Sequence, residues 1–355
     1  MFLAWRDLRF AKGRFALMGA VVVLITVLVG LVSGLTAGLA RQSTSAITDL
    51  PADHLAFAAP ADGEDISFTA STVEEATWLS WAEQPGVTEA EPVAVATARA
   101  EADGVTASVS TFGVLPGSGL APGDVTTGSV VLSTTAAEDL GAAVGDTVAI
   151  AGTDLTVAAV AGDDSYSHTP VVWAALEDVQ QPGHDGPPAA TVVALQTTDA
   201  ADLAAVDAEL GTATVSRADS LSAIGSYTSE NGSLQLMRGF LFAISALVIG
   251  AFFTVWTIQR SGDVAVLKAL GASTSYLLRD ALGQAAVLLA LGTGLGTAIV
   301  AGLGLLVGGA VPFVLSVTTT LLPAVVLIVL GVLGAALAIR RITSVDPLTA
   351  LGSAR

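Results

Sequence analysis

Three uncharged stretches constrain the fold of this chain more than any other feature of its sequence. Residues 15–40, 239–259 and 281–339 contain no Asp, Glu, Lys or Arg. A bilayer core needs roughly 20 apolar residues per helix, so the first two stretches each suit one membrane-spanning helix and the longer third suits two. With 52% hydrophobic and 13% charged residues, the composition also favours a membrane protein. The sequence therefore predicts four transmembrane helices.

The same stretches predict the order of segments. Residues 1–14 mix hydrophobic and basic side chains, which is typical of an amphipathic elbow helix on the inner leaflet. Pro312, the threonines that follow and Pro323 indicate an outer turn within the third stretch. We expect transmembrane helices at 15–41, 237–260, 281–311 and 321–341, an extracytoplasmic domain at 42–236, a cytoplasmic helix at 261–280, an outer loop at 312–320 and a tail at 342–355.

Basic residues predict the orientation. Positive charge gathers on the cytoplasmic side of membrane proteins, and here it lies before the first span, between the second and third, and after the fourth. We therefore expect a cell-membrane protein with an uncleaved first span and with both termini in the cytoplasm. The basic residues expected inside, beyond those of 1–14, are Arg260, Lys268, Arg279, Arg340, Arg341 and Arg355.

Acidic residues are concentrated in the predicted extracytoplasmic domain. Of the 32 acidic residues, all but Asp7, Asp263, Asp280 and Asp346 lie in 42–236. Arg99 and Arg217 are the cations of that segment. This charge excludes nucleic acid as a partner and suits a water-facing domain outside the cell.

The segment 42–236 reads as a mixed α+β domain. Strand patterns occur in VSTFGVLPG and ATVVALQT, and GDTVAIAGTDLTVAAVAGDD predicts a hairpin. STTAAEDLGA and ADLAAVDAEL have helical patterns. His54, His168 and His184 lack metal-ligand spacing, and no nucleophile motif is present, so we expect neither a zinc site nor an enzyme. The absence of cysteine excludes disulfides and thiolate ligands.

The predicted cytoplasmic segment has the pattern of a short helix with one apolar face. Its start is favoured by an acidic residue and its end by a glycine. The start is Asp263, the apolar residues are Val264, Val266, Leu267 and Leu270, and the end is Gly271.

Four motifs together resemble the MacB/FtsX-type ABC transporter permeases. They are LAWRDLRFAKGRF, VVLSTTAAEDLGAAVGDTVAIAGTDLTVAAV, GDVAVLKALGAS and AIRRITSVDPLTALG, so the resemblance covers the whole length. It implies that the cytoplasmic helix is a coupling helix that docks on a separate ATPase. The alternative is a surface helix whose basic residues contact anionic lipid. The residues that match the coupling helix are Gly262, Asp263, Val264, Val266, Leu267, Lys268, Leu270 and Gly271.

The resemblance also implies how ATP is used. The sequence contains no GxxxxGK[ST] motif for binding nucleotide phosphates, so ATP would be bound by a partner subunit. The family architecture implies a homodimer of permeases with two ATPases, surrounded by membrane lipids. Within it, the first two transmembrane helices act as levers on the outer domains.

A fifth motif, DDSYSHTPVVWAAL, resembles the outer domain of haem-exporting permeases of the HrtB type. It implies haem as cargo, with no intrinsic cofactor, and a binding site where the first two spans emerge. Tyr, Glu, Met and His side chains can ligate iron, and Arg can pair with propionates. The candidates are Tyr227, Glu230, Met237, Arg41, Gln42, Arg238 and His168.

Roles other than haem binding remain open for these residues. The arginines can extend to lipid headgroups, Glu230 can be a solvated helix residue, and His168 can hold a turn. Two other functions also remain open. One is export of another amphiphile, such as a lipid, peptide or antibiotic. The other is transmission of movement to a cell-wall partner without transport, as in FtsX.

Overall fold

A computed structural model describes residues 12–179, 188–225, 227–259, 262, 266–268, 270–308 and 311–343. The chain forms two compact units, one of Met1–Gly38 with Ser233–Arg355 and the other of Leu39–Gly232. The predicted elbow helix lies largely outside the described residues; its last residues, from Lys12, already belong to the first long helix. The predicted tail also lies outside them, apart from its first two residues.

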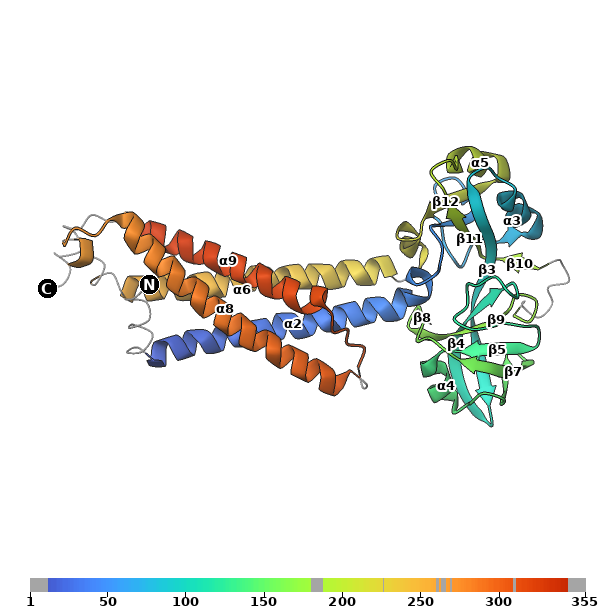
Figure 1. Cartoon of the computed structure of the whole chain (residues 1–355), viewed down its shortest axis with the longest axis horizontal. Helices are drawn as coiled ribbons and strands as arrows, with labels where there is room; N and C mark the ends of the chain where they lie inside the picture. Colours follow the sequence, from blue (N-terminus) through green and yellow to red (C-terminus); the bar gives the residue numbers. More distant parts are fainter. Residues whose placement is uncertain are drawn as a thin grey trace. The chain divides into compact units, whose positions relative to one another are not determined.

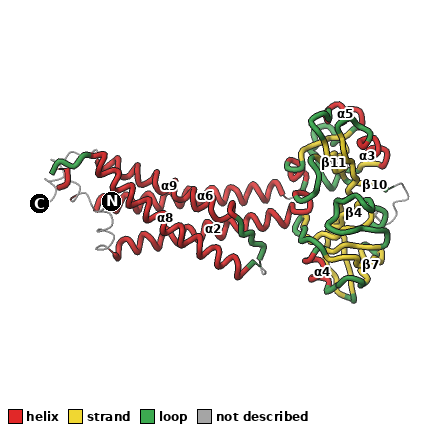
Figure 2. The backbone as a smooth tube through the Cα atoms, viewed as in Figure 1, coloured by secondary structure: helices red, strands yellow, loops and turns green. Residues whose placement is uncertain are grey.

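The first unit is a bundle of long helices (Figures 1 and 2). Each helix contains a segment long and apolar enough to cross a membrane, which confirms the four predicted spans. One cluster of buried side chains draws on every helix, from Met18 on the first to Ala335 on the last. The helices are α2 (Lys12–Thr48), α6 (Tyr227–Gln259), α8 (Thr274–Val307) and α9 (Val317–Thr343).

Helices α2 and α6 extend further than the sequence predicted, and α8 begins at Thr274, inside the predicted cytoplasmic helix 261–280, rather than at 281. Helix α2 continues past Arg41 to Thr48, because its last turns bury Ala46 and Ile47 in the core of the second unit. Helix α6 begins at Tyr227 rather than at 237, and it carries Glu230 in its first turn, where a negative charge complements the helix dipole. Both extensions contain polar residues, and such residues favour the prediction of a loop when only the sequence is known.

The predicted outer loop at 312–320 is too long, because α9 begins within it at Val317. The Ser316 hydroxyl accepts the backbone N–H of Thr319, and the Thr319 hydroxyl accepts the backbone N–H of Ser316. This reciprocal capping starts the helix. Pro323 lies inside α9 instead of marking the turn, as happens in transmembrane helices when neighbouring groups satisfy the freed carbonyl.

The connection between α8 and α9 packs closely against α2. The Val314 N–H donates to the Gly34 carbonyl at 3.1 Å. A Cβ at Gly38 would lie 1.8 Å from the Pro312 carbonyl oxygen, so only glycine fits there. This contact fixes the connection to the outer half of α2.

The second unit is an α+β domain built on one large sheet (Figures 1 and 2). The strands of the domain are β1 (His54–Ala58), β2 (Val73–Glu74), β3 (Val87–Ala102), β4 (Val105–Val114), β5 (Ser129–Leu132), β6 (Thr147–Ile150), β7 (Thr153–Val160), β8 (Ser165–Tyr166), β9 (Thr169–Ala175), β10 (Ala189–Ala190), β11 (Val192–Thr197) and β12 (Thr212–Ser216), of which β2 and β10 pair in a separate small sheet. Its helices are α3 (Glu75–Ala82), α4 (Thr134–Leu140), α5 (Leu203–Leu210) and the 3-10 turn η1 (Asp219–Ala223).

The long strand β3 organises this domain into two lobes. Its second half closes a ring with β4, β9, β5, β7 and β6, since β6 pairs back to β3. Small and branched side chains fill the ring, among them Val109, Leu132 and Ile150. The first half of β3 continues a layer through β11, β1 and β12, against which α3 and α5 pack.

The local elements predicted for this domain are confirmed. The expected hairpin is β6–β7, and the two predicted helices are α4 and α5. Helix α4 is capped by the Ser133 hydroxyl and ends at Gly141, whose φ is +64°.

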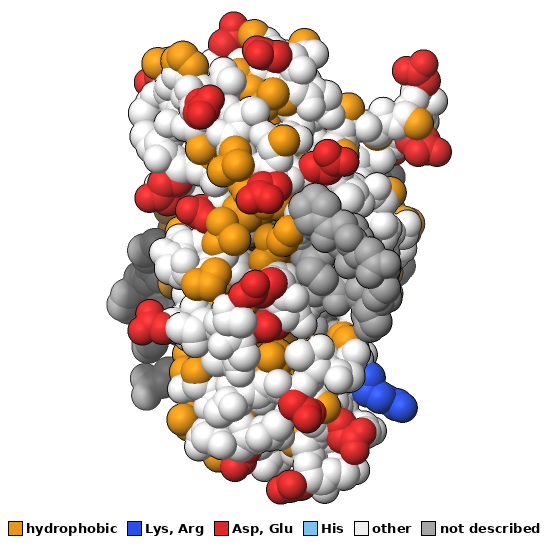
Figure 3. Space-filling view, turned by 90° about the vertical axis from the view of Figure 1, so that its right-hand side faces the viewer, with side chains coloured by type: hydrophobic (Ala, Val, Ile, Leu, Met, Phe, Trp, Pro, Cys, Tyr) orange, Lys and Arg blue, Asp and Glu red, His pale blue; other side chains and the backbone are white. Residues whose placement is uncertain are grey.

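An aromatic chain links the centre of the domain to the end of α2. Phe112 contacts both Trp173 and Tyr166, and Tyr166 in turn contacts Phe68. The cluster that contains these rings also buries Ile47 of α2. Figure 3 shows a face of the domain on which acidic side chains are scattered among apolar ones.

Candidate functional site

The tip of the β8–β9 hairpin contacts the end of α2. Ser167 and His168 form its two-residue turn, and their φ angles are +49° and +64°. Positive φ at both positions is the geometry whose twist matches a hairpin. In this geometry the Ser167 N–H donates to the Ser43 carbonyl at 3.0 Å, and the His168 N–H donates to the Gln42 carbonyl at 3.1 Å.

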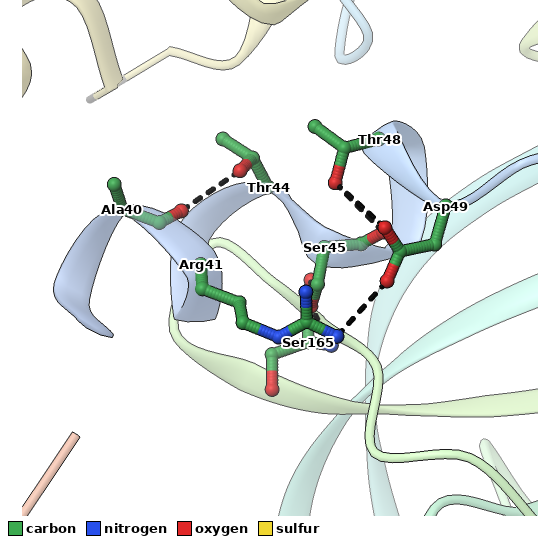
Figure 4. Close-up of polar contacts among 7 residues, drawn as sticks. All are labelled: Ala40, Arg41, Thr44, Ser45, Thr48, Asp49 and Ser165. Atoms are coloured by element: carbon green, nitrogen blue, oxygen red, sulfur yellow. Dashed lines mark hydrogen bonds and ion pairs between the residues drawn. The ribbon is translucent and has the colours of Figure 1, made fainter. Parts of the chain in front are cut away.

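Side chains of α2 strengthen this attachment (Figure 4). The Ser45 hydroxyl accepts the Ser165 N–H at 2.8 Å and is 3.2 Å from the Ser165 carbonyl oxygen. The Arg41 guanidinium is paired, since it lies 3.0 Å from the carboxylate of Asp49, the residue that directly follows α2. The end of α2 is therefore joined to the hairpin through both backbone and side-chain groups.

A side-chain contact connects the same hairpin to α6. His168 Nε2 lies 2.9 Å from Glu230 Oε2, and each of the two side chains is 34% exposed. The hairpin tip therefore contacts α2 through its backbone and α6 through a side chain.

The surroundings of the hairpin raise the pKa of two side chains, Asp164 and Tyr166. Burial is the main cause that raises the pKa of Asp164, and the nearby Asp49 carboxylate adds to the effect, while Arg41 opposes it. Burial also raises the pKa of the Tyr166 hydroxyl. The hairpin therefore carries one carboxyl group whose charged form is disfavoured in the folded domain.

The structure brings together some of the predicted site residues. Gln42, His168 and Glu230 meet at the hairpin tip, and Tyr227 packs half-buried against the adjacent core. Met237 and Arg238 lie further along α6, where Met237 is 54% exposed. Within the described residues, no group of three or more His, Asp or Glu side chains is arranged to hold a metal ion.

The serines that build this site were not predicted from the sequence. Ser43, Ser45 and Ser165 carry the attachment between α2 and the hairpin. The signal available was the polar run Gln-Ser-Thr-Ser directly after an apolar span. Such a run can continue a helix when its hydroxyls find partners.

The described part of the predicted coupling helix ends as expected at Gly271. The Ala272 N–H donates to the Leu267 carbonyl at 2.9 Å, the Gly271 N–H donates to the Lys268 carbonyl at 3.0 Å, and Gly271 has φ +94°. This pattern is the Schellman motif. Val266 is 57% exposed and Leu270 is 79% exposed, so this turn presents apolar side chains. Gly262 is described and exposed, while Asp263 and Val264 lie outside the described residues.

Taken together, these features define a class of protein. Four apolar helices with a large α+β domain inserted between the first and second form a multi-pass membrane protein with an extracytoplasmic domain. The chain belongs to the MacB/FtsX family of ABC transporter permeases. Residues 15–213 match the family model of the MacB-like periplasmic core domain, and residues 236–347 match that of the FtsX-like permease C-terminal region. Members of this family are ABC transporter permeases, which implies a partner ATPase.

Curated relatives include permeases named for hemin transport. The chain is 26% identical over 209 residues to a putative hemin transport system permease protein HrtB of Staphylococcus epidermidis, a match that covers 58% of this chain and 59% of the relative. It is 37% identical over 129 residues to the protein of that name in Staphylococcus haemolyticus, covering 36% and 37%. These matches span less than two thirds of each relative.

Another relative and a solved structure also match parts of the chain. An uncharacterized ABC transporter permease of Mycobacterium bovis is 27% identical over 285 residues, which is 76% of each chain. Among solved structures, the periplasmic region of MacB from Actinobacillus actinomycetemcomitans aligns with a TM-score of 0.36 at 10% identity, covering 50% of this chain and 95% of that one.

Proposed function

We propose that this chain is the permease subunit of an ABC exporter that removes haem from the membrane. A separate cytoplasmic ATPase would supply the energy. The observation that carries the proposal is the similarity to hemin transport permeases, added to membership of the permease family. Haem is flat and mostly apolar, so it enters such a site from the lipid.

The residues near the hairpin tip supply the chemistry that haem needs. A carboxylate, phenol, thioether or imidazole can ligate the iron, and cationic or amide groups can hold the propionates. Glu230 and His168 already engage each other, and Arg41 engages Asp49, so these groups exchange partners when haem binds. Met237 is more than half exposed and accessible without such an exchange. The proposed haem-binding residues are Tyr227, Glu230, Met237, Arg41, Gln42, Arg238 and His168.

The exposed turn that ends at Gly271 suits the proposed contact with the ATPase. Val266 and Leu270 are four residues apart, which places them on one face of a helical turn. Apolar side chains of this kind seat in a groove on a partner protein. In this proposal the coupling segment Gly262, Asp263, Val264, Val266, Leu267, Lys268, Leu270 and Gly271 receives the movement that ATP binding produces.

The rest of the proposal concerns orientation and assembly. Both termini and the coupling segment lie in the cytoplasm, as the distribution of basic residues indicates. Two permeases assemble with two ATPases, and α2 and α6 act as levers on the outer domains. Both helices are long and unbroken, α2 from Lys12 to Thr48 and α6 from Tyr227 to Gln259, which supports a lever role.

Haemin titration of the purified chain in lipid nanodiscs tests the cargo. We expect a saturable shift of the Soret band at micromolar haemin, which weakens in Glu230→Ala and Met237→Ala. Glu138→Ala is the control, because Glu138 is an exposed residue of helix α4 and is not one of the proposed haem-binding residues. A Soret band that does not change with the wild-type chain would contradict haem as cargo and favour another amphiphile.

A further inference from the structure

The hairpin tip is attached to α2 and to α6 by contacts of different strength. Toward α2, two backbone N–H groups donate to helix carbonyls, and the Ser45 hydroxyl bonds Ser165. Toward α6, the hairpin tip makes a side-chain contact, His168–Glu230 at 2.9 Å. The α2 attachment is therefore multiple and largely fixed by the backbone, whereas the α6 contact joins two side-chain ends.

The conformation of the turn supports this difference. Ser167 and His168 both have positive φ, although neither is glycine, so the turn needs compensation from its surroundings. The bonds to the Ser43 and Gln42 carbonyls provide it, because they use the N–H groups that this conformation turns toward α2. The hairpin and the end of α2 therefore hold each other in place.

The hairpin is also joined to the ring of strands. The Ser110 hydroxyl of β4 lies 3.2 Å from the Tyr166 carbonyl oxygen and 2.5 Å from the Thr169 hydroxyl. Strand β9 then continues into the ring between β4 and β5. Hydrogen bonds and strand pairing therefore join the end of α2, the hairpin and the ring, and we expect these three parts to move together.

The contact with α6 is suited to breaking and re-forming. Both of its side chains are about one third exposed, so water can replace either partner without opening the core. A hydrogen bond between partly solvated groups adds little net stability, because water competes for both ends.

We infer that the His168–Glu230 contact is a breakable clasp between the first turn of α6 and the hairpin that is bonded to the end of α2. This inference rests on the proposed function in one respect, that α2 and α6 move as levers during the transport cycle. His168 acts as a positioning residue, and the closed clasp occupies the imidazole nitrogen and carboxylate oxygen that would otherwise reach an iron. Haem ligation by either side chain therefore requires the clasp to open.

A distance measurement between the hairpin and α6 tests the clasp. The chain has no cysteine, so Ser167→Cys and Thr228→Cys, both at exposed positions, accept two spin labels without background. The labelled chain is measured alone in nanodiscs, without haemin or nucleotide. We expect one short distance in the clasped protein, and in His168→Ala a fall of about three- to tenfold in the ratio of short to long distances.

Three further variants sharpen the result. Glu230→Ala is expected to match His168→Ala, and Glu230→Gln, which keeps an oxygen acceptor, is expected to shift the ratio less. The control is His54→Ala, since His54 is a half-buried histidine of β1 whose Nδ1 contacts Thr197 at 3.2 Å. Identical distances in the wild type, His168→Ala and Glu230→Ala would overturn the clasp, and so would an equal shift in Glu230→Ala and Glu230→Gln.

Haemin titration of the same samples separates the two proposals. A changed distance without any Soret response would leave the clasp in place and contradict haem as cargo. A Soret response with unchanged distances in every variant would support haem binding and overturn the clasp.

Discussion

Removing the Ser45 hydroxyl tests how α2 is attached to the outer domain. Ser45 is 1% exposed, and in Ser45→Ala the Ser165 N–H loses its acceptor at 2.8 Å. Leaving a buried donor unpaired costs about 1–3 kcal/mol, and the half-buried position of Ser165 places the loss in the lower part of that range, about 1–2 kcal/mol. For a domain of this size each kcal/mol lowers Tm by about 2–4 °C, so the expected drop is about 2–8 °C.

The matched control is Ser80→Ala. The Ser80 hydroxyl donates to the Ala76 carbonyl within α3 at an exposed position, so its removal leaves no buried donor behind. Both variants replace a helical serine by alanine, and the change in helix propensity therefore cancels in the comparison. Thermal unfolding of the full chain in detergent, followed by circular dichroism, measures the difference. Equal Tm values for Ser45→Ala and Ser80→Ala would refute the reasoning.

Three more predictions follow from particular residues. Burial and Asp49 raise the pKa of Asp164, so its charged form destabilises the folded state; Asp164→Asn should raise Tm at neutral pH, and the gain should vanish as pH falls through the raised pKa to the ordinary aspartate range. Leu270→Asp should weaken ATPase co-purification about ten- to a hundredfold, because a buried leucine contributes about 1.5–3 kcal/mol, whereas Val144→Asp in the outer domain should not. Gly38→Ala should lower Tm through a clash with the Pro312 carbonyl, while Gly302→Ala, with open space around it, should leave Tm unchanged or raise it.

The membrane part of the fold could be predicted from charge alone. Because a charged side chain is costly in lipid, gaps such as 15–40 and 239–259 are sufficient to place a span. The ends of the helices could not be placed in this way. Residues up to Thr48 remain helical because Ile47 is buried in the core of the second unit, to which the end of α2 belongs. Such burial depends on tertiary structure, which the local sequence does not show.

The outer domain was predictable only where its contacts are local. The β6–β7 hairpin and the capped helix α4 follow from turn and cap residues near in sequence. The closed ring depends on the parallel pairing of β4 with β9 and of β5 with β7, which join distant segments and leave no local signal.

The candidate site shows the same limit. The sequence suggested His168 and Glu230 separately, each as a ligand, but these residues are 62 positions apart and their contact depends on the hairpin turn. Arg41 was expected to be available for a propionate, but it pairs with Asp49, which lies eight positions further on and past the end of α2, beyond the reach of the i,i+3 and i,i+4 pairs that a helix pattern predicts.

ATP hydrolysis by the complex of this chain with its ATPase measures the central claim most directly. We propose that a cytoplasmic ATPase drives the export of haem by this permease. In nanodiscs, the hydrolysis rate should rise with haemin and saturate over the same micromolar range as the Soret titration, and Leu270→Asp should abolish the rise. A rate that stays constant while haemin saturates its site would contradict haem export driven by this ATPase.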